Sequence, residues 1–130
     1  MIRCIVVTPE KTEIDIECEF VSLPMFDGQL GVQKQRSAMI GRLGYGVLRL
    51  ATADGSRQYF IDGGFAQVEN DIVSVLTGQS IPVSELSRSD AGEVVEKALA
   101  MEASSEETLQ LKETALQRAR GMLRAAEQAG

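Results

Sequence analysis

Two hydrophobic patterns divide this chain near residue 82. Up to Ile81, short apolar runs alternate with turn-forming residues, as is typical of β-strands. After Pro82 there are no further prolines, alanine and glutamate become common, and apolar residues recur at intervals of three and four. We therefore predict a mainly β domain over residues 1–82, followed by a helical domain over residues 83–130.

The first part predicts strands that are short and closely spaced. Alternation is clearest after Pro9, where Ile14, Ile16 and Cys18 are interleaved with acidic residues, as expected of a half-buried strand. The predicted strands cover residues 2–8, 12–23, 46–52, 57–62, 65–68 and 72–77. Because no helical pattern separates them, they favour an antiparallel β-sandwich or a flattened barrel.

Turn signals lie between these strands. Asp27-Gly28, Ala53-Asp54-Gly55-Ser56 and Asn70-Asp71 are all typical of tight turns. Gly63-Gly64 interrupts an otherwise apolar stretch and predicts a bulge or a tight reversal, since glycine accepts backbone angles that other residues resist.

The second part predicts two helices. Ser87 and Asp90 form a helix-start signal, and the apolar stripe that follows is Ala91, Val94, Val95, Ala98 and Leu99. Ser104 and Glu107 form a second capping box. The stripe of the second helix is Leu109, Leu116, Ala119, Met122, Leu123 and Ala126. A short connection predicts that the two helices fold back as an antiparallel hairpin.

This hairpin has a thin apolar face. Its first stripe consists mainly of valine and alanine, and Gly92 and Gly121 each cost about 1 kcal/mol relative to alanine in a helix interior. We therefore expect it to depend on the β domain, on a partner, or on both in turn. A hairpin that switches position and a static appendage are equally compatible with the sequence.

Composition excludes several classes of function. The 130 residues include no histidine or tryptophan, and the net charge of −6 argues against non-specific nucleic-acid binding and adsorption to anionic lipid. No apolar run approaches the roughly 20 residues of a membrane span, and the first residues do not have the form of a signal peptide. Any membrane association should therefore go through a protein partner.

No catalytic, cofactor or metal site is predicted. Cys4 and Cys18 are interpreted as buried, unpaired thiols on neighbouring strands, since there is no CxxC pair and no histidine to complete a metal site. Without histidine the serines cannot form a catalytic triad. The glycines at 41, 44 and 46 are not followed by the Gly-Lys-Ser/Thr of a phosphate loop.

Three segments together resemble one family. They are Val6-Val7-Thr8-Pro9-Glu10, Asp27-Gly28-Gln29-Leu30-Gly31-Val32, and the stretch from Tyr59 to Leu76 with its Gly-Gly pair. This set is similar to the epsilon subunit of the rotary F-type ATP synthase. The likeness covers essentially the whole chain, and is strongest over residues 4–32 and 46–77.

The resemblance implies a fold and a role. It implies a β-sandwich of about ten strands, followed by a two-helix hairpin, and a non-catalytic subunit of the central stalk that is monomeric when isolated. Its partners would be the gamma subunit and the c-ring, at the cytoplasmic face of the bacterial inner membrane. The hairpin would transiently reach the alpha/beta hexamer and restrain ATP hydrolysis.

Individual residues follow from the same resemblance. The loop Asp27, Gly28, Gln29, Leu30 and Gly31 would face the c-ring, and Thr8 and Arg36 would face gamma. Arg118, Arg120 and Arg124 on the second helix would meet an acidic segment of the beta subunit. For these arginines, a solvated helix face is an equally good interpretation, because residues 83–130 carry 6 basic and 9 acidic side chains, a net charge of −3.

The chain departs from the family pattern in two places. Gln33-Lys34-Gln35-Arg36 replaces a segment that usually contains Leu-Pro-x-His, which predicts a more mobile loop. In the segment Leu86-Ser87-Arg88-Ser89-Asp90-Ala91, Ser87 stands where the ATP-binding motif of some relatives has Asp, and Asp90 stands where it has Arg. We therefore expect weak or no ATP binding. Two alternatives remain: a small-ligand or nucleotide sensor on the same fold, and an unrelated β-sandwich adaptor with a helical interaction tail.

Overall fold

The computed structural model describes residues 1–129 of the chain. These group into two compact units, one over Met1–Pro82 and one that begins at Val83. The first unit is built from strands and the second from helices.

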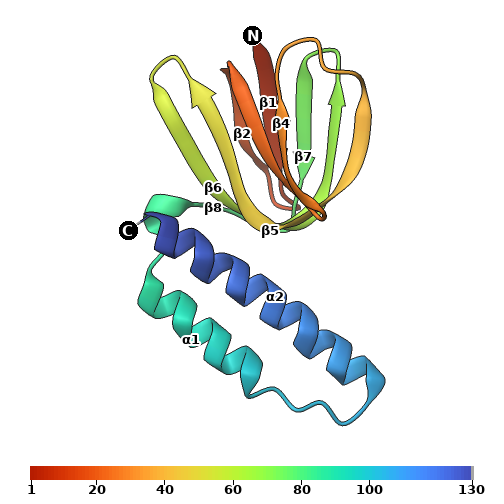
Figure 1. Ribbon diagram of the computed structural model, residues 1–130, viewed down its shortest axis with the longest axis vertical. Helices are drawn as coiled ribbons and strands as arrows, with labels where there is room; N and C mark the ends of the chain where they lie inside the picture. The colour runs from red at the N-terminus through yellow and green to blue at the C-terminus, as the bar shows by residue number, and fades with distance from the viewer. Residues whose placement is uncertain (130) are drawn as a thin grey trace. The chain divides into compact units, whose positions relative to one another are not determined.

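The first unit contains eight strands that form one continuous, folded sheet (Figure 1). The order is β2-β1-β7-β6-β5-β3-β4, and β8 pairs with β6 beside β7. Their bounds are β1 (Ile2–Val7), β2 (Thr12–Cys18), β3 (Phe20–Met25), β4 (Gly28–Val32), β5 (Met39–Thr52), β6 (Gly55–Glu69), β7 (Ile72–Leu76) and β8 (Ser80–Pro82).

The sandwich predicted from the sequence is confirmed, but its strands are counted differently. The resemblance implied about ten strands, whereas β5 and β6 run uninterrupted for 14 and 15 residues in the structure. The two arch from one layer of the sandwich to the other, so each serves both layers (Figure 1). One pair also differs from the antiparallel expectation, because β1 and β7 pair in parallel.

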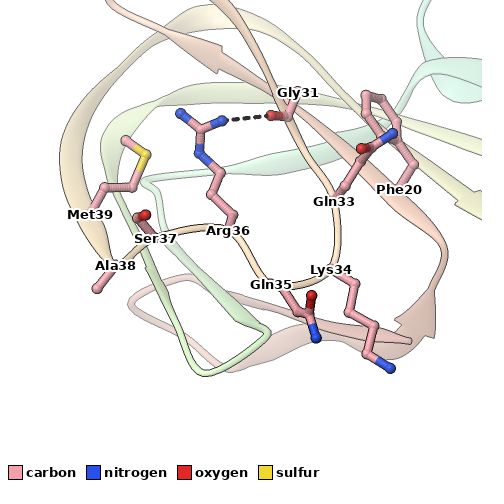
Figure 2. Close-up of a pocket in the computed structure, with 9 residues that line it drawn as sticks. All are labelled: Phe20, Gly31, Gln33, Lys34, Gln35, Arg36, Ser37, Ala38 and Met39. Carbon is pink, nitrogen blue, oxygen red and sulfur yellow. Dashed lines mark hydrogen bonds between the residues drawn. The ribbon is translucent and has the colours of Figure 1, made fainter.

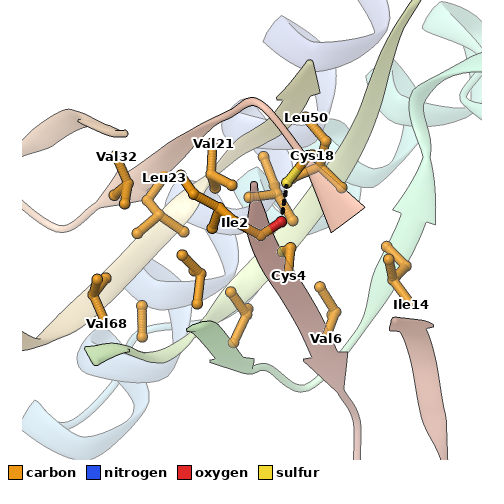
Figure 3. Packing of buried hydrophobic residues seen from close by; sticks show 14 of the residues in the cluster. Ile2, Cys4, Val6, Ile14, Cys18, Val21, Leu23, Val32, Leu50 and Val68 are labelled. Carbon is orange, nitrogen blue, oxygen red and sulfur yellow. Dashed lines mark hydrogen bonds between the residues drawn. The ribbon is translucent and has the colours of Figure 1, made fainter. Parts of the chain in front are cut away.

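A single hydrophobic core fills the space between the layers (Figure 3). It takes inward-facing residues from every strand from β1 to β7, which alternate with outward-facing ones as a pleated strand requires. Its fully buried members include Ile2, Val6, Val21, Leu23, Leu48, Leu50, Val73 and Val75. Cys4 and Cys18 belong to the same core.

Two of the predicted strand boundaries were wrong. The alternation over residues 12–23 is divided at Glu19 into β2, which pairs with β1, and β3, which pairs with β5. Gly63 and Gly64 do not separate two strands. They sit inside β6 with φ angles of +66° and +108°, opposite the gap where β7 ends at Leu76 and β8 begins at Ser80.

The predicted hairpin turns are confirmed. Asn70 and Asp71 adopt φ angles of +53° and +61°, the left-handed pair of a type I′ turn between β6 and β7. Gly55 closes the turn between β5 and β6 with a φ of +127°, and Gly28 closes that between β3 and β4 with a φ of +131°.

The second unit is an antiparallel helical hairpin, α1 (Arg88–Leu99) and α2 (Glu106–Ala129), preceded by the short 3-10 helix η1 (Val83–Glu85) (Figure 1). Ser87 caps α1 as predicted, since its Oγ accepts a hydrogen bond from the Asp90 N–H at 3.3 Å. The second cap is one residue later than predicted. Ser105 Oγ accepts from the Thr108 N–H at 3.2 Å, and Thr108 Oγ1 accepts from the Ser105 N–H at 2.9 Å. The Thr108 hydroxyl thus takes the part that we assigned to the Glu107 carboxylate.

Small side chains dominate the helix packing. Among the described side chains, the fully buried ones of the two helices are all alanines: Ala91, Ala98, Ala119, Ala125 and Ala126. Leu109, predicted to lie in the apolar stripe, is 44% exposed. The thin apolar face expected from the sequence is therefore a property of the folded hairpin.

Candidate interaction surfaces

The described residues contain no cluster of His, Cys, Asp or Glu that could hold a metal ion. Both cysteines are free and buried. Burial raises the pKa of the Cys4 thiol to about 12 and also raises the pKa of Cys18, whose Sγ lies 3.6 Å from the Ile2 carbonyl oxygen (Figure 3). Because the thiolate is the reactive form, these cysteines act as core side chains.

None of the described helices is both long and apolar enough to cross a lipid bilayer.

The loop predicted to face the c-ring forms the β3–β4 hairpin. Asp27 lies in the turn, and β4 pairs with β3 from Gly28 to Val32. The Gln29 side chain donates one hydrogen bond to Ser22 Oγ at 2.8 Å and another to the Val47 carbonyl at 3.3 Å. A side chain at Gly31 would meet the Phe20 ring, since an added Cβ would lie 2.8 Å from its Cζ. These contacts hold β4 against β3 and β5.

The segment that departs from the family pattern follows directly. Gln35 adopts a left-handed φ of +68°, and its N–H donates to Asp71 Oδ1 at 2.6 Å. Arg36 donates from Nη1 to the Gly31 carbonyl at 3.4 Å, while the Lys34 side chain extends away from it (Figure 2). Two hydrogen bonds thus join this segment to β4 and to the β6–β7 turn, and its greater mobility stays a prediction.

Arg36 lies between two open pockets. One, of about 570 Å³, is lined by Phe20, Gly31 and the segment from Gln33 to Met39 (Figure 2). The other, of about 560 Å³, is lined by Met25, Phe26, Asp27, Gly28, Gln29, Leu30, Arg36, Met39, Ile40, Gly41 and Arg42. The second pocket therefore joins the β3–β4 turn to the start of β5.

Thr8, the other residue predicted to face gamma, is buried. Its Oγ1 lies 3.2 Å from both the Lys11 carbonyl and Glu13 Oε1, so the hydroxyl is satisfied inside the β1–β2 turn. The structure does not bring it together with Arg36. Asp71, which bonds to the segment that contains Arg36, accepts a hydrogen bond from the Arg3 N–H through its carbonyl oxygen. Thr8 lies five residues after Arg3 in the chain, roughly 16 Å from it at strand spacing.

An exposed apolar row crosses the outer face of β5, β6, β7 and β1. Arg42 is opposite Phe65, Phe65 is opposite Leu76, and Leu76 is opposite Val7. Phe65 and Leu76 are 56% and 54% exposed, and Ile40, two residues before Arg42 on the same face, is 73% exposed. We call Ile40, Arg42, Phe65, Leu76 and Val7 the outer face. Exposed apolar patches of this kind mark interaction sites.

The three arginines predicted to be regulatory all lie on α2 and are exposed. Arg120 and Arg124 are one helical turn apart and share a face. Glu113 and Gln117 continue that face toward the start of the helix, and both are exposed. The arrangement is equally suited to solvent and to an acidic partner.

Comparison with known proteins identifies the family. The family described as "ATP synthase, Delta/Epsilon chain, beta-sandwich domain" matches residues 1–83. The ATP synthase epsilon chain of Rhodopirellula baltica is 60% identical over 124 residues, which covers 95% of this chain and 97% of the relative. This chain belongs to the ATP synthase epsilon-chain family.

Solved structures agree with the epsilon fold. A chain in the Euglena gracilis mitochondrial ATP synthase (OSCP/F1/c-ring) superimposes with a TM-score of 0.84 at 23% identity, covering 95% of this chain and 80% of that one. A chain in the Tetrahymena thermophila mitochondrial ATP synthase (central stalk/c-ring) gives 0.77 at 14% identity, covering 96% of each chain. At this level of identity the likeness concerns the fold.

Sequence reasoning missed several residues at these surfaces of the epsilon chain, among them Phe26, Arg42, Phe65 and Asp71. A signal existed for Phe65, which shares the outward parity of Gln67 and Glu69 in the same strand. No comparable signal existed for Asp71, because its partner Gln35 is 36 residues away in sequence.

Proposed function

We propose that this epsilon chain is a non-catalytic subunit of the central stalk, which binds gamma through its outer face and the c-ring through its β3–β4 hairpin. The observation that carries the proposal is the outer face itself. An epsilon-family sandwich that leaves Phe65, Leu76 and Ile40 in water has apolar surface that a partner can bury. Burying a side chain of this size contributes about 1.5–3 kcal/mol.

The β3–β4 hairpin supports a coupling role. A stalk subunit transmits torque, which requires a stiff contact. A contact that is already ordered also loses little conformational entropy on binding. The Gln29 hydrogen bonds to Ser22 and Val47, together with the close packing of Gly31 on Phe20, supply that stiffness. Asp27, Gly28, Gln29, Leu30 and Gly31 are accordingly proposed as the c-ring contact. Thr8 supports the neighbouring turn, and Arg36 flanks the gamma contact.

The hairpin is proposed as the regulatory part. Opening the two helices would give up little apolar burial, because their buried side chains are alanines and each alanine buries less surface than a leucine or valine. Arg118, Arg120 and Arg124 would meet the alpha/beta hexamer transiently and restrain hydrolysis. The complex would hold this subunit at the cytoplasmic face of the bacterial inner membrane, without any insertion of its own.

Size-exclusion chromatography with light scattering, on this chain mixed with gamma from the same source, tests the proposal. We expect a 1:1 complex at tens of micromolar. Phe65→Ser should weaken it by roughly tenfold, since about 1.4 kcal/mol of lost burial changes affinity tenfold. Leu111→Ser is the matched control, because Leu111 is 63% exposed but lies on α2. Separate elution of the native chain and gamma would favour the adaptor alternative.

A further inference from the structure

One stretch of this acidic chain contains no acidic residue. Residues 28–53 include Lys34, Arg36, Arg42 and Arg49 but neither Asp nor Glu, so this stretch carries +4. With a total of −6, the rest of the chain carries −10. Positive charge is therefore concentrated on β4, β5 and the segment between them.

Two of these cations line one pocket. Arg36 and Arg42 both border the pocket of about 560 Å³ between the β3–β4 turn and the start of β5. The guanidinium carbon of Arg42 lies 4.7 Å from the centroid of the Phe26 ring. Arg36 makes one long hydrogen bond, to the Gly31 carbonyl. Both side chains belong to exposed residues.

Neither arginine has a carboxylate partner within the part of the chain that the structure describes. Ion pairs elsewhere in that part of the chain include those of Arg3 with Asp15 and of Lys11 with Glu13. Asp27 lines the same pocket but forms no ion pair with either arginine. A guanidinium has five N–H donors in a planar fork, and stacking on an aromatic ring leaves the edge of that fork open to a carboxylate.

The surroundings of the pocket indicate what kind of ligand it takes. Phe26 and Ile40 line it and are 65% and 73% exposed, so it offers apolar surface beside the two cations. Arg42 is also the cross-strand partner of Phe65, which makes the pocket continuous with the outer face. A small inorganic anion would leave the apolar side chains uncovered. A protein segment with a carboxylate next to an apolar residue would cover both.

We propose that this pocket receives an acidic segment of the gamma subunit, in which an Asp or Glu binds Arg36 and Arg42 and a neighbouring apolar side chain packs on Phe26 and Ile40. The inference rests on the proposed function, because it names the chemistry of the gamma contact. Arg42 is its central residue and extends the outer face to the pocket. Arg36 defines the other rim.

Charge reversal tests this pairing. The double variant Arg36→Glu, Arg42→Glu should bind gamma roughly tenfold more weakly or worse, because truncating or reversing a partnered charge at an interface costs 1.4 kcal/mol or more. Arg49→Glu is the matched control, since Arg49 is also exposed on β5 but lies outside the pocket. It should bind as the native chain does. Affinity is measured by isothermal titration calorimetry at two salt concentrations.

The salt dependence of gamma binding gives a second test of this pairing. Binding of the native chain should weaken from low to high salt, and binding of the double variant should change little or strengthen. Thermal melts confirm that the variants fold, and the neutral pair Arg36→Gln, Arg42→Gln repeats the test if the reversed pair does not. Equal binding of native and substituted chains to gamma would overturn the acidic-segment proposal alone. A native chain that does not bind gamma would overturn the proposed function, and this inference with it.

Discussion

At the residue scale, Gly64 has no room for a side chain. Its φ is +108°, and an added Cβ would collide with the Leu76 carbonyl oxygen and lie 3.0 Å from Thr77 Cα. Both neighbours are backbone, at the point where β7 ends beside β6. They cannot move aside without breaking the pairing of the two strands.

We therefore predict that Gly64→Ala lowers the free energy of unfolding by roughly 3 kcal/mol or more, and that Gly64→Val prevents folding of the sandwich. Gly55→Ala is the control, because Gly55 has a φ of +127° but nothing within 4 Å of an added Cβ. It should cost only the backbone strain, about 1–2 kcal/mol. Urea unfolding followed by circular dichroism measures both, and equal losses would show that the Leu76 contact is unimportant.

Gly63 and Gly64 show what the residue type alone can and cannot predict. Their presence between apolar runs predicted an unusual backbone, and the structure confirms left-handed angles at both. The sequence could not show that the strand continues through them. That outcome depends on β7 and β8 both pairing with one edge of β6, and the β6–β8 pairing is not a hairpin between successive strands.

At the element scale, the N-terminal cap of α2 is formed by only one of two neighbouring serines. Ser105 exchanges hydrogen bonds with Thr108 in both directions, whereas the sequence favoured Ser104 with Glu107. We predict that Ser105→Ala destabilises the start of α2 by about 1 kcal/mol, and that Ser104→Ala has almost no effect. Amide hydrogen exchange over the first turn of α2 distinguishes them. Faster exchange in the Ser104 variant would restore the original assignment.

Elements that depend on local patterns were predicted well. The β5–β6 and β6–β7 hairpins, the cap of α1 and the order of strands before helices all follow from turn residues, alternation and helical spacing. The parallel pairing of β1 with β7 did not follow, because the two strands lie about 70 residues apart and pairing at that distance leaves no local trace. The same reason explains why the outer face was missed: it joins residues from four strands.

At the scale of the whole molecule, family membership was predictable because three short motifs recur in the right order, while the surfaces were only partly so. The Asp27–Gly31 hairpin could be named from its motif. The basic pocket required β5 to be placed beside the β3–β4 turn, which the predicted strand over 46–52 did not reach. In the proposed function, the sandwich carries the docking surfaces and the hairpin carries the regulation.

The proposed regulation by the helical hairpin can be tested through two arginines of α2. If the hairpin restrains hydrolysis through Arg120 and Arg124, replacing both with alanine should raise ATP hydrolysis by the assembled complex roughly two- to thirtyfold, since exposed charge contacts contribute about 0.2–1 kcal/mol each. Both side chains are exposed, so the loss should leave folding intact. Lys97→Ala, which removes an exposed cation from α1, is the control and should leave the rate unchanged. Assembly is verified by co-purification with gamma before rates are compared. An unchanged rate in the double variant would identify the hairpin as a static tail, because a contact that inhibits through these charges cannot survive their removal.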